Sequence, residues 1–238
     1  MLRCSFSILA GFGLLALTGC VVKGVHTGPD EHESRSIPLD KAEMVRAEIR
    51  IGAGELKIRG GSSNLVDADF TYNVPSWKPD FSYDATGFRG RLKIDQPGSE
   101  HGHFGNTKYL WDLRFNGGVP LSFNIHFGAG NAELDLGSLS LDNVDVNMGV
   151  GNLRLDLKGS PKKDYHISVH GGVGNATIYL PSGVGIVADA HGGLGSIEAR
   201  DLHKQGSRYV NDAYENHAKV NVRLEIRGGL GNLQLIGG

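Results

Sequence analysis

Two glycines flanking one small apolar residue occur six times in this chain, and an alternating strand pattern follows each copy. The glycines are Gly52 and Gly54, Gly128 and Gly130, Gly149 and Gly151, Gly172 and Gly174, Gly193 and Gly195, and Gly229 and Gly231. Four central copies begin at positions 128, 149, 172 and 193, a step of 21 to 23 residues. A fixed period of this size is typical of stacked supersecondary units, each too small to bury its own apolar face. The repeat therefore predicts an all-β, single-domain β-solenoid with rungs of about 21–23 residues.

Apolar residues keep the same phase around every glycine pair. The third and fifth residues before the first glycine are apolar, as in Ile125 and Phe123, and so are the fourth and sixth residues after it, as in Leu153 and Leu155. This alternation predicts a strand, a corner and a second strand, with one face inward. A phosphate-binding loop needs a helix after its glycines, and the calcium-binding nonapeptide repeat needs an aspartate. Neither accompanies these glycines, so we interpret them as structural turns.

The first twenty residues have the pattern of a bacterial lipoprotein signal. An apolar stretch over residues 8–17 is too short to span a bilayer, and the sequence Leu-Thr-Gly-Cys that ends at Cys20 matches the lipobox. We therefore expect a signal peptide at 1–19, a lipid on Cys20 and a flexible tether over 20–40. The alternative is an ordinary secretory signal that ends in a cysteine. Val21 stands where many lipoproteins of the inner membrane have Asp, which favours the outer membrane in a Gram-negative cell.

Composition fits an exported protein that binds no nucleic acid. The only cysteines are Cys4, within the expected signal, and Cys20, so the mature chain has no free thiol and no disulfide once Cys20 is acylated. A formal net charge of −2 provides no basic field for nucleic acid. We expect the membrane to be contacted through the N-terminal lipid.

The rest of the chain is expected to form one domain over residues 41–238. Residues 62–118 interrupt the repeat with four strand patterns, at 65–72, 79–85, 90–95 and 109–115. Turn signals between them predict a β-meander that caps the open end of the solenoid. Regular rungs fill 119–200, and an insertion at 201–218 precedes the last rung, which is expected to close the chain.

The order of these motifs resembles the toast-rack family of bacterial envelope proteins, β-solenoids found in cell-envelope-stress proteins of the Lia type and in adhesin-like proteins. The matching segments are IGAGEL at 51–56, GGS at 60–62, PDFSY at 79–83, WDL at 111–113, GVPL at 118–121 and LPSGVG at 180–185. These motifs are structural, so the resemblance implies the fold more firmly than an activity. It implies this fold over residues 40–238.

The sequence offers no catalytic arrangement and one weak metal candidate. It has no Gly-x-Ser-x-Gly elbow, and the mature chain has no thiol, so we expect no enzyme activity and no cofactor. His101 and His103 have a His-x-His spacing, which in an extended segment places both rings on one side, as two metal ligands require. The alternative is a flexible polar loop, because no third ligand is identifiable.

A column of polar residues stands two places before the first glycine of each pair. Its members are Arg50, His126, Asn147, His170, His191 and Arg227. Alternation points this column outward, next to an acidic column at Glu48, Asp145, Asp189 and Glu225, and rungs about 4.8 Å apart align both as ladders. Imidazole changes charge near neutral pH, so the column is a candidate contact for anionic lipid or an envelope polyanion. The alternative is a solvated face with cross-strand charge pairing.

These features predict an exported, lipid-anchored, non-catalytic envelope protein. It would act as a binding module, or as an envelope-stress sensor with a membrane-protein partner. Two alternatives stay open: an adhesin that binds glycan or another cell, and a periplasmic protein that binds metal through His101 and His103.

Overall fold

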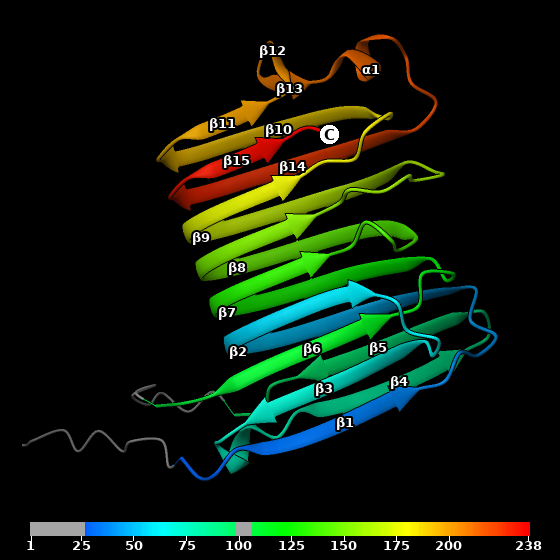
Figure 1. Ribbon diagram of the computed structural model, residues 1–238, viewed down its shortest axis with the longest axis vertical. Helices are drawn as coiled ribbons and strands as arrows, with labels where there is room; N and C mark the ends of the chain where they lie inside the picture. The colour runs from blue at the N-terminus through cyan, green and yellow to red at the C-terminus, as the bar shows by residue number, and fades with distance from the viewer. Residues whose placement is uncertain (1–26, 99–105) are drawn as a thin grey trace, which may run out of the picture.

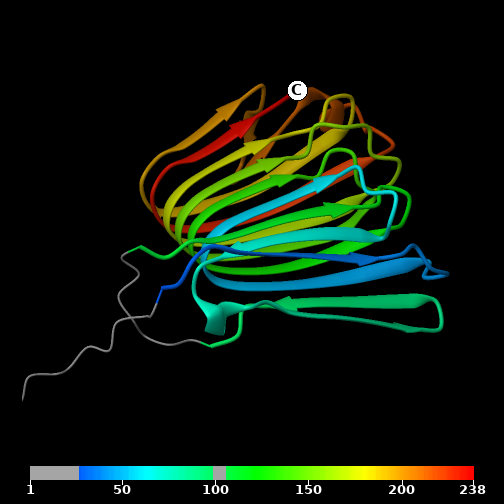
Figure 2. The same cartoon turned by 60° about the horizontal axis from the view of Figure 1, so that its bottom comes forward.

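The computed structural model of the protein describes residues 27–98 and 106–238. Cys20, His101 and His103 therefore lie outside the described residues. Within the part of the chain that is described, no helix has the length and apolar character needed to cross a membrane. The strands belong to one 15-stranded sheet, which folds back on itself so that two layers face each other (Figures 1 and 2).

Six stacked rungs form the body of the solenoid. Four rungs are single long strands that bend at the glycine pair: β2 (Met44–Gly60), β7 (Leu121–Asp135), β8 (Leu141–Asp156) and β9 (Tyr165–Tyr179). In two rungs the corner separates two strands: β10 (Gly185–Leu194) with β11 (Ile197–Arg200), and β14 (Asn221–Leu230) with β15 (Leu233–Ile236). Neighbouring rungs pair in parallel with their corners in register, as Gly130 does with Gly151. The part of each rung before the corner lies in what we call the first layer, and the part after it in the second layer (Figure 1).

The core lies between the two layers. In β7 the buried residues alternate with partly or fully exposed ones on both sides of the corner, as in Phe123 and Ile125 before it and Ala132 and Leu134 after it. Successive strand residues point to opposite faces, so one set of residues from every rung reaches this core. Burying each large apolar side chain stabilises the fold by about 1.5–3 kcal/mol. The predicted β-solenoid is confirmed.

The strands expected between residues 62 and 118 are present, but they do not pair as a meander. They are β3 (Val66–Tyr72), β4 (Asp80–Thr86), β5 (Arg89–Asp95) and β6 (Tyr109–Phe115). β5 and β4 extend the first layer beyond β2, whereas β6 and β3 extend the second layer. A short 3-10 turn, η1 (Pro75–Trp77), lies between β3 and β4, where the chain passes from one layer to the other. The core is open on both layers at this end, and a meander of consecutive strands would extend only one of them.

Large aromatic side chains fill the core of this N-terminal end. Trp111 is fully buried, and its ring meets that of Phe70 edge to face with centroids 5.3 Å apart. Tyr109 packs against Trp77 in the same way, and its hydroxyl donates to the Trp77 carbonyl oxygen at 2.7 Å.

Residues 31–37, predicted to belong to the tether, are instead strand β1 (Glu31–Ile37). β1 pairs antiparallel with β3 over its whole length. Ser34 donates to Asp69 and Ser36 to Asp67, each at 2.6 Å. Main-chain pairing and these side-chain contacts therefore hold a segment that has too few apolar residues to indicate a strand from composition.

The last rung in the sequence is not the last rung in space. β14 lies between β9 and β10, and β15 lies between β9 and β11, as Figure 1 shows in red below the orange strands. The insertion contains β12 (His203–Gln205), β13 (Arg208–Val210) and helix α1 (Asp212–Glu215). β13 pairs with β10 and continues the first layer. All rungs share one repeat and the repeat does not specify neighbours, so the order of the last two rungs in the sequence does not give their order in space.

Candidate functional site

The predicted polar column forms a continuous row on the outer face of the first layer. Its spatial order is Arg50, His126, Asn147, His170, Arg227 and His191, each in register with the next. Arg227 lies between two histidines because β14 is inserted before β10. All of these residues except the half-buried Asn147 are exposed. We call this row the stripe.

The cations of the stripe pair with acids of their own strands. Arg50 forms an ion pair with Glu48, and Arg227 with Glu225 at 2.6 Å. His191 Nε2 lies 2.6 Å from Asp189 Oδ1. A spacing of two residues along a strand places both side chains on one face, which explains why these pairs form within strands. Exposed pairs of this kind contribute about 0–1 kcal/mol each and leave most of the cationic hydrogen-bond donors available.

A second basic column, missed in the sequence, flanks the acids on their other side. Its members in register are Arg46, Ser122, Asn143, His166 and Arg223, on β2, β7, β8, β9 and β14. The signal was present, because these residues lie two places before the acidic column. Across the three columns, four arginines balance the four acids named above, and four histidines (His126, His166, His170 and His191) are added to them. On the six rungs these three columns therefore have no net formal charge when imidazole is neutral and become positive when it is protonated, and β5 continues them with Arg91, Lys93 and Asp95.

The glycine corners hold adjacent backbones in close contact. At Gly151 φ is +139°, and an added Cβ would lie 1.8 Å from the carbonyl oxygen of Gly130. At Gly172 the added carbon would lie 2.3 Å from the carbonyl oxygen of Gly149. Both glycines of a pair are thus required, the second by its backbone conformation and both by the stacking distance.

Asparagines after the corner hydrogen-bond to one another across the rungs. Asn152 donates to Asn131 at 2.9 Å, Asn175 to Asn152 at 3.3 Å and Asn232 to Asn175 at 3.2 Å. Ser196 of the outermost rung continues the ladder by donating to Asn232 at 2.9 Å. A polar groove on the second layer runs beside this ladder.

Comparison with known families identifies the fold. The N-terminal domain of toast_rack matches residues 26–179, more than half of the chain. The chain belongs to the toast-rack family. A second match, to the C-terminal region of LiaF, described as a cell wall-active antibiotics response protein, covers residues 129–235. The predicted family is therefore confirmed.

A solved structure resembles this toast-rack protein closely. It is a putative cell adhesion protein from Clostridium sporogenes, with 29% sequence identity and a TM-score of 0.83, and the match covers 88% of this chain and 100% of that one. A putative adhesin from Bacteroides fragilis matches at 10% identity with a TM-score of 0.31, over 87% of this chain and 97% of that one. No curated protein matches the chain significantly.

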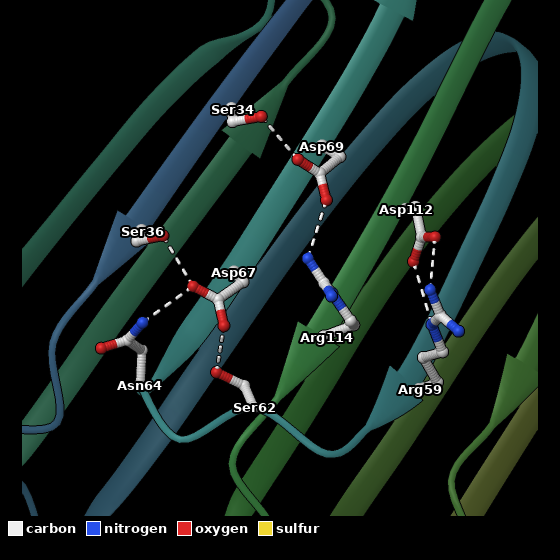
Figure 3. A network of polar contacts seen from close by, with 9 residues as sticks. All are labelled: Ser34, Ser36, Arg59, Ser62, Asn64, Asp67, Asp69, Asp112 and Arg114. Carbon is white, nitrogen blue, oxygen red and sulfur yellow. Dashed lines mark hydrogen bonds and ion pairs between the residues drawn. The ribbon is translucent and has the colours of Figure 1, made fainter.

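A network of polar contacts covers the outer face of the toast-rack domain at its N-terminal end (Figure 3). Asp67 accepts hydrogen bonds from Ser36 and Ser62 at 2.6 Å and from Asn64 at 2.8 Å. These bonds, that from Ser36 above all, stabilise the carboxylate and lower the pKa of Asp67. The network joins β1, β3 and the loop before β3, so we assign it a structural role.

Two ion pairs extend the same network toward β2 and β6 (Figure 3). Arg114 donates to Asp69 at 2.9 Å, and Arg59 contacts Asp112 through two nitrogens at 2.7 and 3.2 Å. They link neighbouring strands of the second layer across its outer face.

His203 joins the hairpin of the insertion to helix α1. Its Nε2 lies 2.9 Å from Glu215 Oε1, and its Nδ1 lies 3.7 Å from Asp212 Oδ1. The hydrogen bond to Glu215 and the charges of both acids raise the pKa of His203. Each ring nitrogen faces a different carboxylate, so the arrangement is an ion-pair cluster that links β12 to α1 within the insertion.

A serine–histidine contact on β9 lacks the geometry of a catalytic site. Ser168 Oγ lies 3.0 Å from His170 Nε2, but Ser168 is buried. In the described part of the chain no carboxylate contacts the His170 ring. A nucleophile needs both access to substrate and an oriented base, and this pair provides neither.

Proposed function

We propose that this toast-rack protein is a lipid-anchored, non-catalytic binding module of the bacterial cell envelope, and that its stripe contacts anionic groups of an envelope polymer or lipid. The observation that carries the proposal is the balance of formal charge in three columns on the outer face of the first layer. Four arginines and four acids occupy three adjacent columns, and four histidines stand among them in register. Phosphate and carboxylate groups spaced along a polymer or a membrane surface complement such a row.

Acidification is expected to strengthen this contact. Imidazole groups in general gain a positive charge at mildly acidic pH, at which carboxylates in general are still ionised. Net charge on the face then rises above zero. The interaction is exposed, so it should weaken as salt is added.

Family membership supports the envelope setting. The match to a cell wall-active antibiotics response protein favours a sensing role, in which ligand binding at the stripe changes the interaction with a membrane-protein partner. The leader sequence supports anchoring through a lipid on Cys20, at the outer membrane if the cell has one. The surroundings of Ser168 and His170 support a role without catalysis.

Binding to phosphatidylglycerol vesicles and to lipopolysaccharide tests the proposal, each measured at about pH 5.5 and about pH 8. We expect wild-type binding to be tighter at the lower pH, and a His126→Gln/His170→Gln/His191→Gln variant to lose most of that difference. A His32→Gln/His217→Gln variant removes histidines away from the stripe and should behave as wild type. Equal binding by all three proteins at both pH values, or binding by none of them, would show the stripe to be a solvated sheet face.

The second candidate is an adhesin. It is favoured by the similarity to the putative cell adhesion protein from Clostridium sporogenes and by the groove beside the asparagine ladder, since amide groups hydrogen-bond well to sugar hydroxyls. Glycan-array binding that is lost in Asn152→Leu and kept in the triple histidine variant would favour this candidate over the first.

A further inference from the structure

The middle residues of the six glycine corners form an apolar row along one edge of the solenoid. In spatial order they are Ala53, Ala129, Val150, Val173, Leu230 and Leu194, each in register with the next. We call this row the ridge. Neighbouring rungs are about 4.8 Å apart, so the ridge is about 24 Å long. Its residues change from alanine to valine to leucine toward the C-terminal end of the solenoid.

Large members of the ridge are exposed. Val150, Val173 and Leu194 are 55%, 45% and 74% exposed. The corner itself does not require a large residue, because alanine stands at the same position in β2 and β7. Single exposed apolar residues are common on protein surfaces, whereas a contiguous row of them indicates a contact surface.

The two flanks of the ridge differ in charge. On the first layer the stripe runs beside it, because each member of the stripe stands three residues before a member of the ridge, at most about 10 Å along the chain. The acids that pair with the stripe stand two residues farther from the edge. On the second layer, the residues two places after the ridge are Glu55, Asn131, Asn152, Asn175, Asn232 and Ser196. The large end of the ridge therefore has cations and imidazoles on one flank and neutral amides on the other.

The chain enters the domain at this same edge. β1 begins at Glu31, which is in register with Tyr72 at the end of β3, and Tyr72 is in register with Tyr109 at the start of β6. The carbonyl oxygen of Tyr109 lies at the corner of β2, 2.3 Å from a Cβ added at Gly54. Figure 1 shows the start of β1 on the side of the molecule where the rungs bend. The ridge and the entry point of the chain thus face the same way.

A lipid on Cys20 would hold this edge close to a membrane. Cys20 is seven residues before Thr27, where the described part of the chain begins, and seven residues span at most about 25 Å. A connection this short gives an effective concentration on the order of millimolar. A contact too weak to bind a membrane alone would therefore be largely formed in the anchored protein.

We propose that the corner edge of the solenoid docks on a bilayer that contains anionic lipid, with the ridge at the acyl boundary and the stripe at the head groups. Amphipathic surfaces bury their apolar groups about 5–10 Å into the boundary between head groups and acyl chains, which matches the separation of the ridge from the stripe. The inference rests on the proposed lipid anchor, and it deepens the proposed function by selecting lipid as the anionic ligand and the corner edge as the surface that meets it.

Depth-dependent fluorescence quenching tests this orientation in the lipidated protein, reconstituted into phosphatidylcholine vesicles with and without phosphatidylglycerol. A nitrobenzoxadiazole reporter on Ala129→Cys lies on the ridge, and acylation of Cys20 leaves the introduced cysteine as the free thiol of the mature chain. The same reporter on Phe88→Cys lies at the opposite edge, because the next residue, Arg89, is in register with Met44 at the start of β2. Lipids brominated on their acyl chains should quench the first reporter and not the second. Measurements at about pH 8 keep imidazole neutral, so they test the ridge and the arginines without the histidines.

The ridge variant Val150→Ala/Val173→Ala/Leu194→Ala gives these corners the residue that β2 and β7 already have, so it should melt as wild type does. Each buried methylene changes partitioning by up to about fourfold, and the variant removes two carbons from each valine and three from the leucine. The ratio of docked to undocked protein, read from the reporter on Ala129→Cys, should therefore fall at least about tenfold.

Two further variants separate the apolar and ionic contributions. Leu39→Ala/Phe88→Ala removes exposed apolar side chains from the opposite edge, where Leu39 is 49% and Phe88 68% exposed, and should dock as wild type. Arg50→Gln/Arg227→Gln should reduce docking on vesicles with phosphatidylglycerol and leave docking on phosphatidylcholine alone unchanged.

Equal quenching of the two reporters, or unchanged quenching in the ridge variant, would overturn the proposal. Cross-linking between two copies through Val173→Cys, without quenching at the ridge, would also overturn it and show the ridge to be an interface between copies. Protein that stays with the vesicles but shows no quenching counts against the docking alone. Protein that does not stay with the vesicles counts against the lipid on Cys20 as well, so the two failures are distinguishable.

Discussion

A methyl group added at Gly174 should destabilise the solenoid, whereas one added at Gly171 on the same strand should not. At Gly174 φ is +146°, and the new carbon would lie 1.7 Å from the carbonyl oxygen of Gly151. At Gly171 it would meet no atom within 4 Å. Gly174→Ala and Gly171→Ala therefore make one chemical change in two opposite environments, three residues apart.

The size of the effect follows from these distances. To bring the contact at Gly174 to 3.0 Å, the rungs must separate locally by at least 1.3 Å. A side chain at this φ costs about 1–3 kcal/mol, displacement of a packed backbone about 1–3 kcal/mol, and a weakened ladder hydrogen bond about 1 kcal/mol. We expect Gly174→Ala to lose roughly 3–7 kcal/mol of the roughly 5–15 kcal/mol that a domain has. Gly171→Ala should gain up to about 1 kcal/mol.

Urea unfolding followed by circular dichroism measures both changes, and Gly172→Val serves as a second corner variant. The midpoint should fall for the two corner variants and rise slightly for Gly171→Ala. Hydrogen exchange should show lost protection in β8 and β14, because each rung is stabilised by its neighbours. Equal midpoints for Gly174→Ala and Gly171→Ala would refute the close stacking at the corner.

Three further predictions concern the ends of the chain. Asp67→Asn should speed hydrogen exchange in β1, because it removes about 1–2 kcal/mol of stabilisation. The pKa of Asp67 is lowered in the folded state, so this stabilisation should be present above the ordinary pKa of 3.8 and lost as pH falls through the lowered pKa. Unchanged exchange in β1 would contradict this role. The raised pKa of His203 implies that its ion pairs stabilise the insertion fully below pH 6.5 and less as pH rises through the raised pKa. Hydrogen exchange in β12 and α1 should therefore quicken at high pH in wild type but not in His203→Gln. A pH effect that persists in the variant would exclude this cause. Cys20→Ala should abolish labelling with palmitate, and retained labelling would place the lipid elsewhere.

The repeat made the body of the fold predictable from sequence. Phase around each glycine pair identified the inward residues, because a corner and a strand period of two leave only one face for the core, as Ile125 and Leu134 illustrate. β1 was missed because its stability comes from pairing with β3 and from contacts to Asp67 and Asp69, which a local pattern cannot show. The order of the last two rungs was missed because β10 and β14 have the same repeat pattern, so either could pair with β9.

The candidate sites were predictable to different degrees. Register alone placed the stripe, including His170 and Arg227, since stacked rungs align equivalent residues. The open space beside Gly171 and Gly192 was not predicted, although the sequence shows its cause. The position just before the corner holds Phe127 and Met148 in earlier rungs and glycine in these later ones. These glycines stand next to the corner glycines in the sequence, so they were taken as part of the corner. Only the structure distinguishes a glycine in close contact with the next rung from one beside open space.

The insertion of β14 and β15 between earlier rungs limits the order in which the rungs can stack as the chain emerges during synthesis. Rungs from β2 to β9 can stack as each emerges, but β10 and β11 have no neighbouring rung until β14 and β15 arrive. A chain truncated after Arg200 would lack an interior rung and not a terminal one, and β9 and β10 would be left as two unpaired edges. A product shortened in this way would therefore expose the edges of two strands that are paired in the complete fold, and would not simply be a slightly shorter solenoid.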